Sequence, residues 1–435
     1  MTKNLLVASV ASLATALLLS SCGNPSDPKL SQTGAAPDLP GVRETLVPAM
    51  KISQPTGWGG EIPNVPQGFT VSAFATDLKI PRQMLILPNG DVLVAEGRGG
   101  HAPRLRPKDV IAGFIKKQGN TKISGGDRIT LLRDADNDGV PEVRAVLVDN
   151  LDAPYGLAYV EGYLYVAEQG ALSRFAFQPG QTGIASPPEQ VTALPSRLNH
   201  HWTKSLAASA DGTKLYVGIG SNSNIGERGM AVEEERAVVW EIDRLTGARR
   251  TIATGIRNPT ALAIEPTTRL LWSVVNERDE LGPQLVPDYL TQVRDGAFYG
   301  WPYSYWGQNP DPRVRPQKPD MVAKAVMPDY ALGSHVAALG LDFARDGGFG
   351  GTFANGAFIG MHGSWNREDP SGYKVVWTPF RDGRPAGPPV DFATGFLKDG
   401  KARGRPVGVT FDPVKRILFV ADDLSNTVWR IAPAR

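Results

Sequence analysis

Donor-rich side chains stand directly before short apolar segments in the second half of the chain. They are His201 and Trp202, Arg257 and Asn258, His335, and Arg403 with Arg405. Imidazole and guanidinium groups donate hydrogen bonds, and the guanidinium fork matches the geometry of a carboxylate. If the fold brings these groups together, they suit an anionic, planar ligand with several carboxylates. The alternative is that each side chain only caps a strand end and bonds to loop carbonyl groups.

The segments that follow these side chains belong to one pattern that occurs six times. Each copy has a polar or proline-containing start, a short apolar strand, a Gly or Asp turn and a second apolar strand. The copies begin at Ile80, Ala153, His200, Arg257, Ser334 and Arg405. Repeated strand pairs, with Ala and Gly where inner strands crowd an axis, are typical of a β-propeller. The sequence therefore predicts an all-β, six-bladed β-propeller with its ligand site at the mouth of the central axis.

Aligning the copies identifies positions that should be equivalent around this axis. Pro81, Pro154, Pro259 and Pro406 fall at one position, so the residues just before it in each copy should surround the axis mouth. Residues 68–74 and 427–432 have the composition of strands and flank the repeats. Because propellers commonly close by pairing strands from both termini in one blade, we expect these two strands to be neighbours.

The first residues have the features of an export signal. Lys3 precedes the apolar stretch from Leu5 to Leu19, which is short for a membrane span. The sequence LSSCG at 19–23 resembles the lipobox of bacterial lipoproteins, so Cys22 is the predicted lipidation site. An ordinary secretory signal with a chance cysteine is the alternative. We predict a signal peptide over 1–22, a flexible tether over 23–63 and the propeller over 64–435. The exported chain would be lipid-anchored, with the propeller in the periplasm or extracellular space.

Composition disfavours several other classes of protein. The 435 residues carry 46 basic and 44 acidic side chains without a basic run, which argues against nucleic acid binding. No Gly-rich phosphate loop lies between a strand and a helix, and no Gly-x-Ser-x-Gly motif occurs. Nicotinamide, ATP and serine-hydrolase chemistry are therefore disfavoured. Cys22 is the only cysteine, so no intramolecular disulfide can form.

Five motifs, in order along the chain, resemble those of the glucose/sorbosone dehydrogenase family. They read LNHHWTKSL from Leu198, IRNPTALAI from Ile256, NERDELG from Asn276, HGSWNR from His362 and GRPVGV from Gly404. The resemblance covers residues 60–433 and is nearer to the sorbosone-dehydrogenase-like branch. Members of this family are six-bladed propellers that use pyrroloquinoline quinone (PQQ) and calcium to oxidise sugars or sugar aldehydes. The resemblance therefore implies PQQ and Ca²⁺ as cofactors here.

The resemblance also implies catalytic roles. His201 matches the family's catalytic histidine, and a neutral imidazole there can take the proton of the substrate hydroxyl. The adjacent His200, where relatives have an aspartate, is expected to point the other way because side chains alternate along an extended strand. Arg257 and Asn258 match an Arg-Asn pair that contacts cofactor and substrate.

Cofactor contacts are implied farther along the chain. Arg403 and Arg405 match an Arg-x-Arg that holds the PQQ carboxylates, and His335 is expected beside the cofactor because of its equivalent place in the fifth copy. The family's cofactor-binding lysine has no clear match. The catalytic calcium of the family uses a carbonyl pair after the fourth hairpin, where this chain has Asn-Glu in place of Gly-Pro. The implied calcium residues are Asn276, Glu277 and Asp279.

A second metal motif lies in the first copy of the repeat. Asp134, Asp136 and Asp138 alternate before Gly139, as in the first half of a calcium loop, and Glu142 could add a late ligand. The twelfth position is Ala145, so a complete EF-hand is not predicted. A structural calcium and a solvated turn between strands are both consistent with the motif.

These observations lead to one predicted function and two alternatives. We predict PQQ- and calcium-dependent oxidation of a sugar or sugar aldehyde of the sorbosone or aldose type. Hydride passes to the quinone, and electrons then pass to a quinone or cytochrome acceptor. The predicted protein binds no nucleic acid and meets the membrane only through its lipid anchor. The alternatives are a non-catalytic propeller that binds carbohydrate or protein, and a calcium-dependent lactonase, whose acidic metal cage the Arg- and His-rich positions do not match.

Overall fold

Short antiparallel strands make up nearly all the regular structure. The computed structural model describes residues 30–44, 50–100, 118–119 and 123–434. Helical elements with defined bounds in that part are α3 (Pro319–Lys324), η1 (Met230–Glu233) and η2 (Gly351–Phe353). The predicted signal peptide and Cys22 lie outside the described residues. Within the described ranges, no helix is long and apolar enough to cross a membrane.

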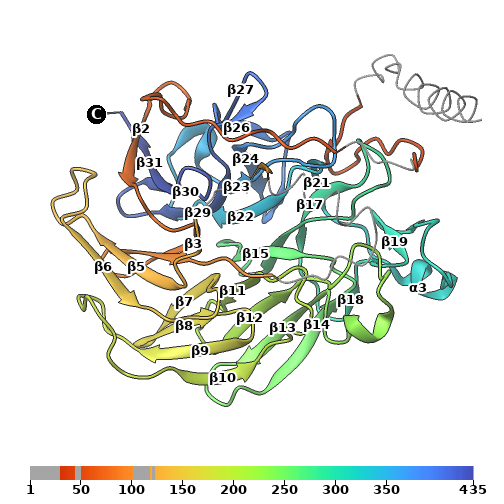
Figure 1. Ribbon diagram of the computed structural model, residues 1–435, viewed down its shortest axis with the longest axis horizontal. Helices are drawn as coiled ribbons and strands as arrows, with labels where there is room; N and C mark the ends of the chain where they lie inside the picture. The colour runs from red at the N-terminus through yellow and green to blue at the C-terminus, as the bar shows by residue number, and fades with distance from the viewer. Residues whose placement is uncertain (1–29, 45–49, 101–117, 120–122, 435) are drawn as a thin grey trace, which may run out of the picture. The chain divides into compact units, whose positions relative to one another are not determined.

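Six sheets, each built on four antiparallel strands, surround a central axis as the blades of a propeller (Figure 1). The first three blades consist of β3 (Pro81–Ile86), β4 (Val92–Glu96), β5 (Arg128–Arg133) and β6 (Val143–Val148); β7 (Gly156–Val160), β8 (Tyr163–Ala167), β9 (Ala171–Ala176) and β10 (Glu189–Ala193); and β11 (Lys204–Ala208), β12 (Lys214–Ile219), β13 (Val238–Asp243) and β14 (Arg249–Thr254). The last three consist of β15 (Pro259–Ile264), β16 (Leu271–Val275), β17 (Pro287–Gln292) and β21 (Tyr330–Ser334); β22 (Ala338–Phe343), β23 (Gly356–Met361), β24 (Lys374–Arg381) and β26 (Val390–Ala393); and β29 (Pro406–Asp412), β30 (Ile417–Asp422), β31 (Thr427–Pro433) and β2 (Phe69–Ala75). The predicted six-bladed fold is confirmed.

The ring closes in the sixth blade. β2 pairs antiparallel with β31, so that Phe69 lies opposite Pro433. The predicted neighbourhood of the first and last strands of the propeller is therefore confirmed. The inner strands β3, β7, β11, β15, β22 and β29 each contact the next, and β29 returns to β3.

Both faces of each blade are buried between its neighbours. Six apolar clusters fill the spaces between adjacent blades. In β30, Leu418 and Val420 pack toward the fifth blade, whereas Phe419 and Ala421 pack toward the first. Because side chains alternate along a strand, an unbroken apolar strand is needed to serve two clusters at once. This explains the continuous apolar runs in the repeats.

Several short segments extend the blades. They are β1 (Thr33–Gly34), which pairs with β21; β18 (Ala297–Phe298), which pairs with β14; the pair β19 (Ser304–Tyr305) and β20 (Asn309–Pro310); β25 (Arg384–Pro385), which pairs with β24; and the pair β27 (Leu397–Lys398) and β28 (Lys401–Ala402). Residues 293–329 form an insertion between β17 and β21, and its Tyr299 and Trp306 pack into the cluster between the third and fourth blades. Farther toward the N-terminus, Pro55 bridges to Ala402 and Asn64 to Thr394.

Candidate functional site

The antiparallel hairpins bring two sets of residues to one end of the axis. In each blade the first residue of the inner strand lies opposite the last residues of the second strand: Pro259 faces Val275, and Pro406 faces Asp422. The residues just before the inner strands and just after the second strands therefore share one end of the propeller. We call this end the rim.

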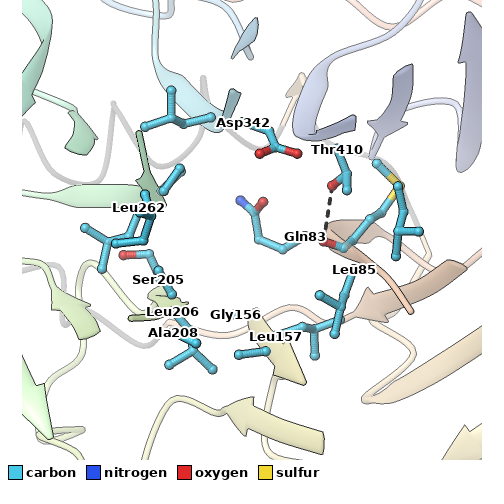
Figure 2. Close-up of a pocket in the computed structure, with 18 of the residues that line it drawn as sticks. Gln83, Leu85, Gly156, Leu157, Ser205, Leu206, Ala208, Leu262, Asp342 and Thr410 are labelled. Carbon is cyan, nitrogen blue, oxygen red and sulfur yellow. Dashed lines mark hydrogen bonds between the residues drawn. The ribbon is translucent and has the colours of Figure 1, made fainter. Parts of the chain in front are cut away.

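Gln83 crosses the axis below the rim. Its Nε2 donates to the Tyr155 hydroxyl (3.1 Å) and to the Leu339 carbonyl (2.7 Å). Burial raises the pKa of Tyr155 to about 12, so the hydroxyl stays protonated. Figure 2 shows the Gln83 side chain at the centre of the inner-strand residues, which enclose a cavity of about 550 Å³. No residue of the predicted site is among those that line this cavity.

His201 is held at the rim by Ser221. Its Nδ1 lies 2.7 Å from the Ser221 carbonyl oxygen and 3.0 Å from Ser221 Oγ. Ser221 Oγ itself donates to the Ser223 carbonyl (2.7 Å), so both oxygens accept from the imidazole. The neutral ring therefore carries its proton on Nδ1 and has a lone pair on Nε2. Burial, followed by the charge of Arg257, holds the pKa of His201 well below its ordinary value.

The expectation that His200 points away from His201 was wrong. The two rings lie edge to face, with centroids 4.7 Å apart. β11 begins only at Lys204, so residues 200 and 201 lie in a bend. Side-chain alternation requires extended strand, and it does not apply there.

Asn258 and His201 both pack directly against the Cα atom of Gly220. A Cβ atom at Gly220 would lie 2.6 Å from the His201 Cβ and would collide with Asn258 Oδ1. This close approach requires glycine at position 220. Asn258 Oδ1 is buried and has no hydrogen-bond donor in the described part of the chain.

Arg257 lies beside these two residues and is only 2% exposed. Its Nη1 donates to the carbonyl oxygens of Asn276 (3.0 Å) and Glu277 (2.6 Å), and its Nη2 donates to Asn224 Oδ1 (3.0 Å). The carbonyl pair that the family resemblance implies for calcium therefore accepts hydrogen bonds from one guanidinium nitrogen of Arg257.

Glu277 and Asp279, in the loop after β16, contact different partners. Glu277 Oε2 accepts from Arg278 Nε (3.0 Å), while Glu277 Oε1 is buried without a partner among the described residues. Asp279 Oδ1 lies 3.5 Å from His335 Nδ1, and His335 Nε2 lies 3.1 Å from the Gly282 carbonyl. Burial alone would lower the pKa of His335, but its hydrogen bond and charge interaction with Asp279 raise it. His335 is therefore engaged with this loop through both ring nitrogens.

Asp288, which the sequence analysis did not single out, ties the two loops together. Its carboxylate accepts from the backbone amides of Glu277 and Ala337, each at 2.7 Å. Burial raises its pKa to about 7, although these two hydrogen bonds and the charge of His335 lower it. The loops that carry Glu277 and His335 are thus fixed by one buried side chain.

Arg405 presents unused donors at the opposite side of the rim. It is 4% exposed, and its Nε and Nη2 have no hydrogen-bond partner in the described part of the chain. Its guanidinium carbon lies 5.8 Å from the centroid of the Tyr373 ring. A buried guanidinium with two nitrogens that no described residue contacts by a hydrogen bond suits a carboxylate.

A group that sequence reasoning missed lies next to Arg405. Asp423 accepts from Arg82 Nη1 (2.7 Å) and contacts His362 Nε2 (3.0 Å). Burial would raise the pKa of Asp423, but the charges of His362 and Arg82 outweigh it and lower the pKa to about 2. Arg82 also lies 5.4 Å from the Trp202 ring centroid, which joins this group to the His201 side of the rim.

The signal for the missed residues was present in the repeat. His362 and Asp423 directly follow the second strands β23 and β30, in the same position as Asn276 after β16. Sequence reasoning used mainly the residues before the inner strands. Antiparallel pairing places both sets at the same end.

Arg403 does not join the rim group. Its guanidinium forms a two-bonded ion pair with Glu61, at 2.7 and 2.8 Å, and lies 5.8 Å from the Trp58 ring centroid. It lines a separate pocket together with Thr76 and Trp429. The structure thus brings His201, Arg257, Asn258 and Arg405 to the rim and engages Arg403 with residues near the N-terminus.

The second predicted metal motif lies far from these residues in the fold, in the hairpin between β5 and β6. Its four carboxylates belong to Asp134, Asp136, Asp138 and Glu142. One oxygen atom from each of them lies within 4.8 Å of one oxygen from each of the others.

Comparison with known proteins finds one family. A family model described as TrAA12-like matches residues 63–287 and 315–434. The unmatched stretch, 288–314, includes the first half of the insertion after β17.

Individual proteins match only part of the chain, at about 30% identity. An uncharacterised protein of Borreliella burgdorferi is 31% identical over 247 residues, which are 56% of this chain and 64% of that protein. A pyrroloquinoline quinone-dependent pyranose dehydrogenase of Coprinopsis cinerea is 30% identical over 127 residues, 25% of this chain and 17% of that enzyme. The chain thus spans less than two thirds of the length of these curated relatives.

Solved structures share the fold. The PQQ domain of the Coprinopsis cinerea pyranose dehydrogenase, in its holo form, superposes with a TM-score of 0.68 at 20% identity, covering 88% of this chain and 100% of that one. A Trichoderma reesei protein of carbohydrate-active enzyme family AA12 gives the same TM-score at 20% identity, covering 88% and 99%. The soluble aldose sugar dehydrogenase of Escherichia coli gives 0.58 at 16% identity, covering 84% and 100%.

Proposed function

The chain belongs to the TrAA12-like family, and from this membership we propose that it is an oxidoreductase that oxidises a sugar or sugar aldehyde with PQQ as its bound cofactor. The observation that carries the proposal is the rim itself. At the rim, two nitrogens of the buried Arg405 guanidinium have no hydrogen-bond partner among the described residues. The imidazole of His201 lies at the same rim with its proton on Nδ1 and a lone pair on Nε2. The relative from Coprinopsis cinerea, named as a PQQ-dependent pyranose dehydrogenase, supports this assignment.

The rim residues fit the chemistry of PQQ and calcium. PQQ carries several carboxylates, and Arg405 offers two unpartnered donors to one of them. Calcium prefers oxygen ligands, and three buried side-chain oxygens near Arg257 lack donors in the described part of the chain: Asn258 Oδ1, Asn276 Oδ1 and Glu277 Oε1. We therefore include calcium in the proposal, held by side-chain oxygens of residues 276–279 rather than by the carbonyl pair that Arg257 contacts.

The protein's own groups would bind the reactants and move one proton. PQQ, when bound, supplies a quinone carbon that accepts hydride from the substrate. His201 Nε2 receives the proton of the substrate hydroxyl, because the bond from Nδ1 to Ser221 holds the ring in the required tautomer. Burial and, after it, the charge of Arg257 lower the pKa of His201, so the base stays neutral before the reaction. Gln83, which lines the axial cavity, is held below the rim by its hydrogen bond to the Tyr155 hydroxyl.

Substrate, acceptor and location remain parts of this proposal. A sorbosone- or aldose-type substrate, a quinone or cytochrome acceptor and a lipid anchor at Cys22 follow from the resemblance and the N-terminal sequence. Replacing Cys22 with Ser tests the anchor: the variant should appear in the soluble extracellular or periplasmic fraction, whereas wild type should sediment with membranes. Equal fractionation of both chains would contradict anchoring through Cys22.

Reconstitution tests the activity. The purified chain is mixed with PQQ and Ca²⁺ and offered a panel of aldoses, sorbosone and simple aldehydes with a reducible dye. We expect a bound-quinone absorbance and dye reduction with at least one sugar. Failure to bind PQQ would reject the proposal, and sugar binding without dye reduction would favour the non-catalytic alternative.

His201→Gln separates catalysis from cofactor binding. Removing the base should abolish most dye reduction, since general-base groups contribute roughly 10²- to 10⁴-fold to rate. The bound-quinone spectrum should persist, because the carboxylate contact at Arg405 is intact. Wild-type turnover in this variant would show that another group is the base.

A further inference from the structure

The loop between β5 and β6 lies at the seam where the ring closes. Its residues contact the last blade: Lys415 Nζ lies 3.4 Å from the Asp134 carbonyl, and a Cβ atom at Gly139 would lie 3.3 Å from Arg430 Cδ. Lys415 belongs to the turn between β29 and β30, and Arg430 to β31. The loop therefore bridges the first and sixth blades.

Each carboxylate of this loop uses one oxygen to hold the backbone. Asp134 Oδ2 accepts from the Gly139 amide (3.1 Å), and Asp136 Oδ1 from the Asp138 amide (3.1 Å). Asp138 Oδ1 accepts from Val140 (2.7 Å), and Glu142 Oε2 from Ala135 (2.8 Å). These bonds fix the backbone of the loop around the four carboxylates.

Asp134, the buried residue of the four, gives a second and separate indication of a bound ligand. Asp134 is 7% exposed, and its Oδ1 is buried with no hydrogen-bond partner in the described part of the chain. A buried, unpartnered carboxylate oxygen is costly unless a cation or donor meets it. Lys415 does not fill this role, since it donates to the Asp134 carbonyl.

We propose that Asp134, Asp136, Asp138 and Glu142 bind one calcium ion, separate from the rim, that stabilises the seam between the first and last blades. The site offers oxygen ligands only, which favours a hard cation over zinc or copper. Four carboxylates from a nine-residue loop, with flexible and partly exposed side chains, suit calcium better than the strict octahedron that Mg²⁺ demands. The inference does not depend on the proposed oxidation, because the loop lies in the outer half of the first blade.

Calcium titration of the chelator-treated full chain, without PQQ, tests the site. Isothermal titration calorimetry should show a calcium-binding event that the Asp136→Asn/Asp138→Asn double variant loses or weakens by at least roughly 10-fold. Both positions are exposed, so the variant should fold. Calcium should also raise the melting temperature of wild type and slow hydrogen exchange in residues 134–142, because a ligand that binds only the folded state stabilises it.

A matched control and a second variant keep the test decisive. Asp149→Asn removes an exposed carboxylate just after β6 and should retain both the binding event and the thermal shift. Glu142→Gln should weaken binding in the same direction as the double variant. Wild-type affinity and exchange protection in the double variant would overturn the proposal, as would stronger stabilisation by Mg²⁺ than by Ca²⁺. Loss of PQQ-dependent activity alone would leave this binding event in place, so the two proposals fail separately.

Discussion

The protonation of His201 is set by its contacts rather than by its residue type alone. The Ser221 carbonyl oxygen accepts a hydrogen bond from the Nδ1–H group, while burial and the charge of Arg257 disfavour the imidazolium form. An isolated histidine would exchange between tautomers and charge states near neutral pH. At the rim it is held as a neutral ring with Nε2 available.

The pH dependence of turnover should report this shift. Because the pKa of His201 lies well below its ordinary value of 6.5, the base stays neutral as pH falls through that value. We expect kcat/KM of the reconstituted enzyme to hold through pH 6.5 and to fall only at more acid pH. Steady-state rates between about pH 8 and about pH 4 check this. A decline centred at or above pH 6.5 would contradict the assignment of His201, with its lowered pKa, as the base.

Arg405 and Arg403 are two residues apart but have different surroundings. Arg405→Ala should weaken PQQ binding by roughly 10- to 100-fold, the range for a lost hydrogen bond to a charged group. Arg403→Ala should weaken it much less, because that guanidinium is already paired with Glu61. Fluorescence or absorbance titration with PQQ compares the two variants. An equal loss in both would show that Arg403 also reaches the cofactor.

At the level of elements, the loop after β16 and the insertion before β21 form one polar unit. Arg278 has no exposed surface and donates to the Pro302 carbonyl, the Ser304 carbonyl and Asp311. It also pairs with Glu277 in its own loop. The insertion therefore holds the segment from which calcium-binding oxygens are proposed to come.

Replacing Arg278 with Leu tests this connection. The change leaves two buried carboxylates, Glu277 and Asp311, without this partner, and such losses cost about 3–5 kcal/mol. We expect a lower free energy of unfolding in denaturant titration and weaker calcium-dependent PQQ binding. Arg384→Leu is the matched control, since its side chain is 70% exposed and its loss should cost less than about 0.5 kcal/mol. Equal stability of the two variants would contradict the proposed role of Arg278.

At the level of the whole molecule, stability depends on closing the ring. Every blade buries both faces against neighbours, so an open ring would expose one face of two blades. β2 and β31 join the two ends of the propeller in one sheet, and Thr410 Oγ1 donates to the Met84 carbonyl across the same seam (3.2 Å). The rim needs this closure, because Arg82 and Asp423 come from the first and last blades.

Removing β31 tests closure directly. A chain ending at residue 426 loses the partner of both β2 and β30, together with Trp429 from the core. We expect loss of the cooperative thermal transition and of PQQ binding, measured by calorimetry and absorbance. A chain that instead ends at residue 433 keeps β31 and serves as the control. A cooperative thermal transition in the shorter chain would show that pairing between β2 and β31 contributes little to the stability of the propeller.

The sequence alone determined the repeated strand pairs, the number of blades, the strands that close the ring and the positions before the inner strands from which rim residues come. These follow from local composition and period, which the chain carries within each repeat. Only the tertiary structure decided which side chains remain free. Arg403 is paired with Glu61, 342 residues away, and Asp423 contacts His362 and Arg82 from other blades. Arg405, in contrast, has two nitrogens without a hydrogen-bond partner in the described part of the chain. Such pairings depend on long-range packing, because contacts between blades are made by residues far apart in sequence.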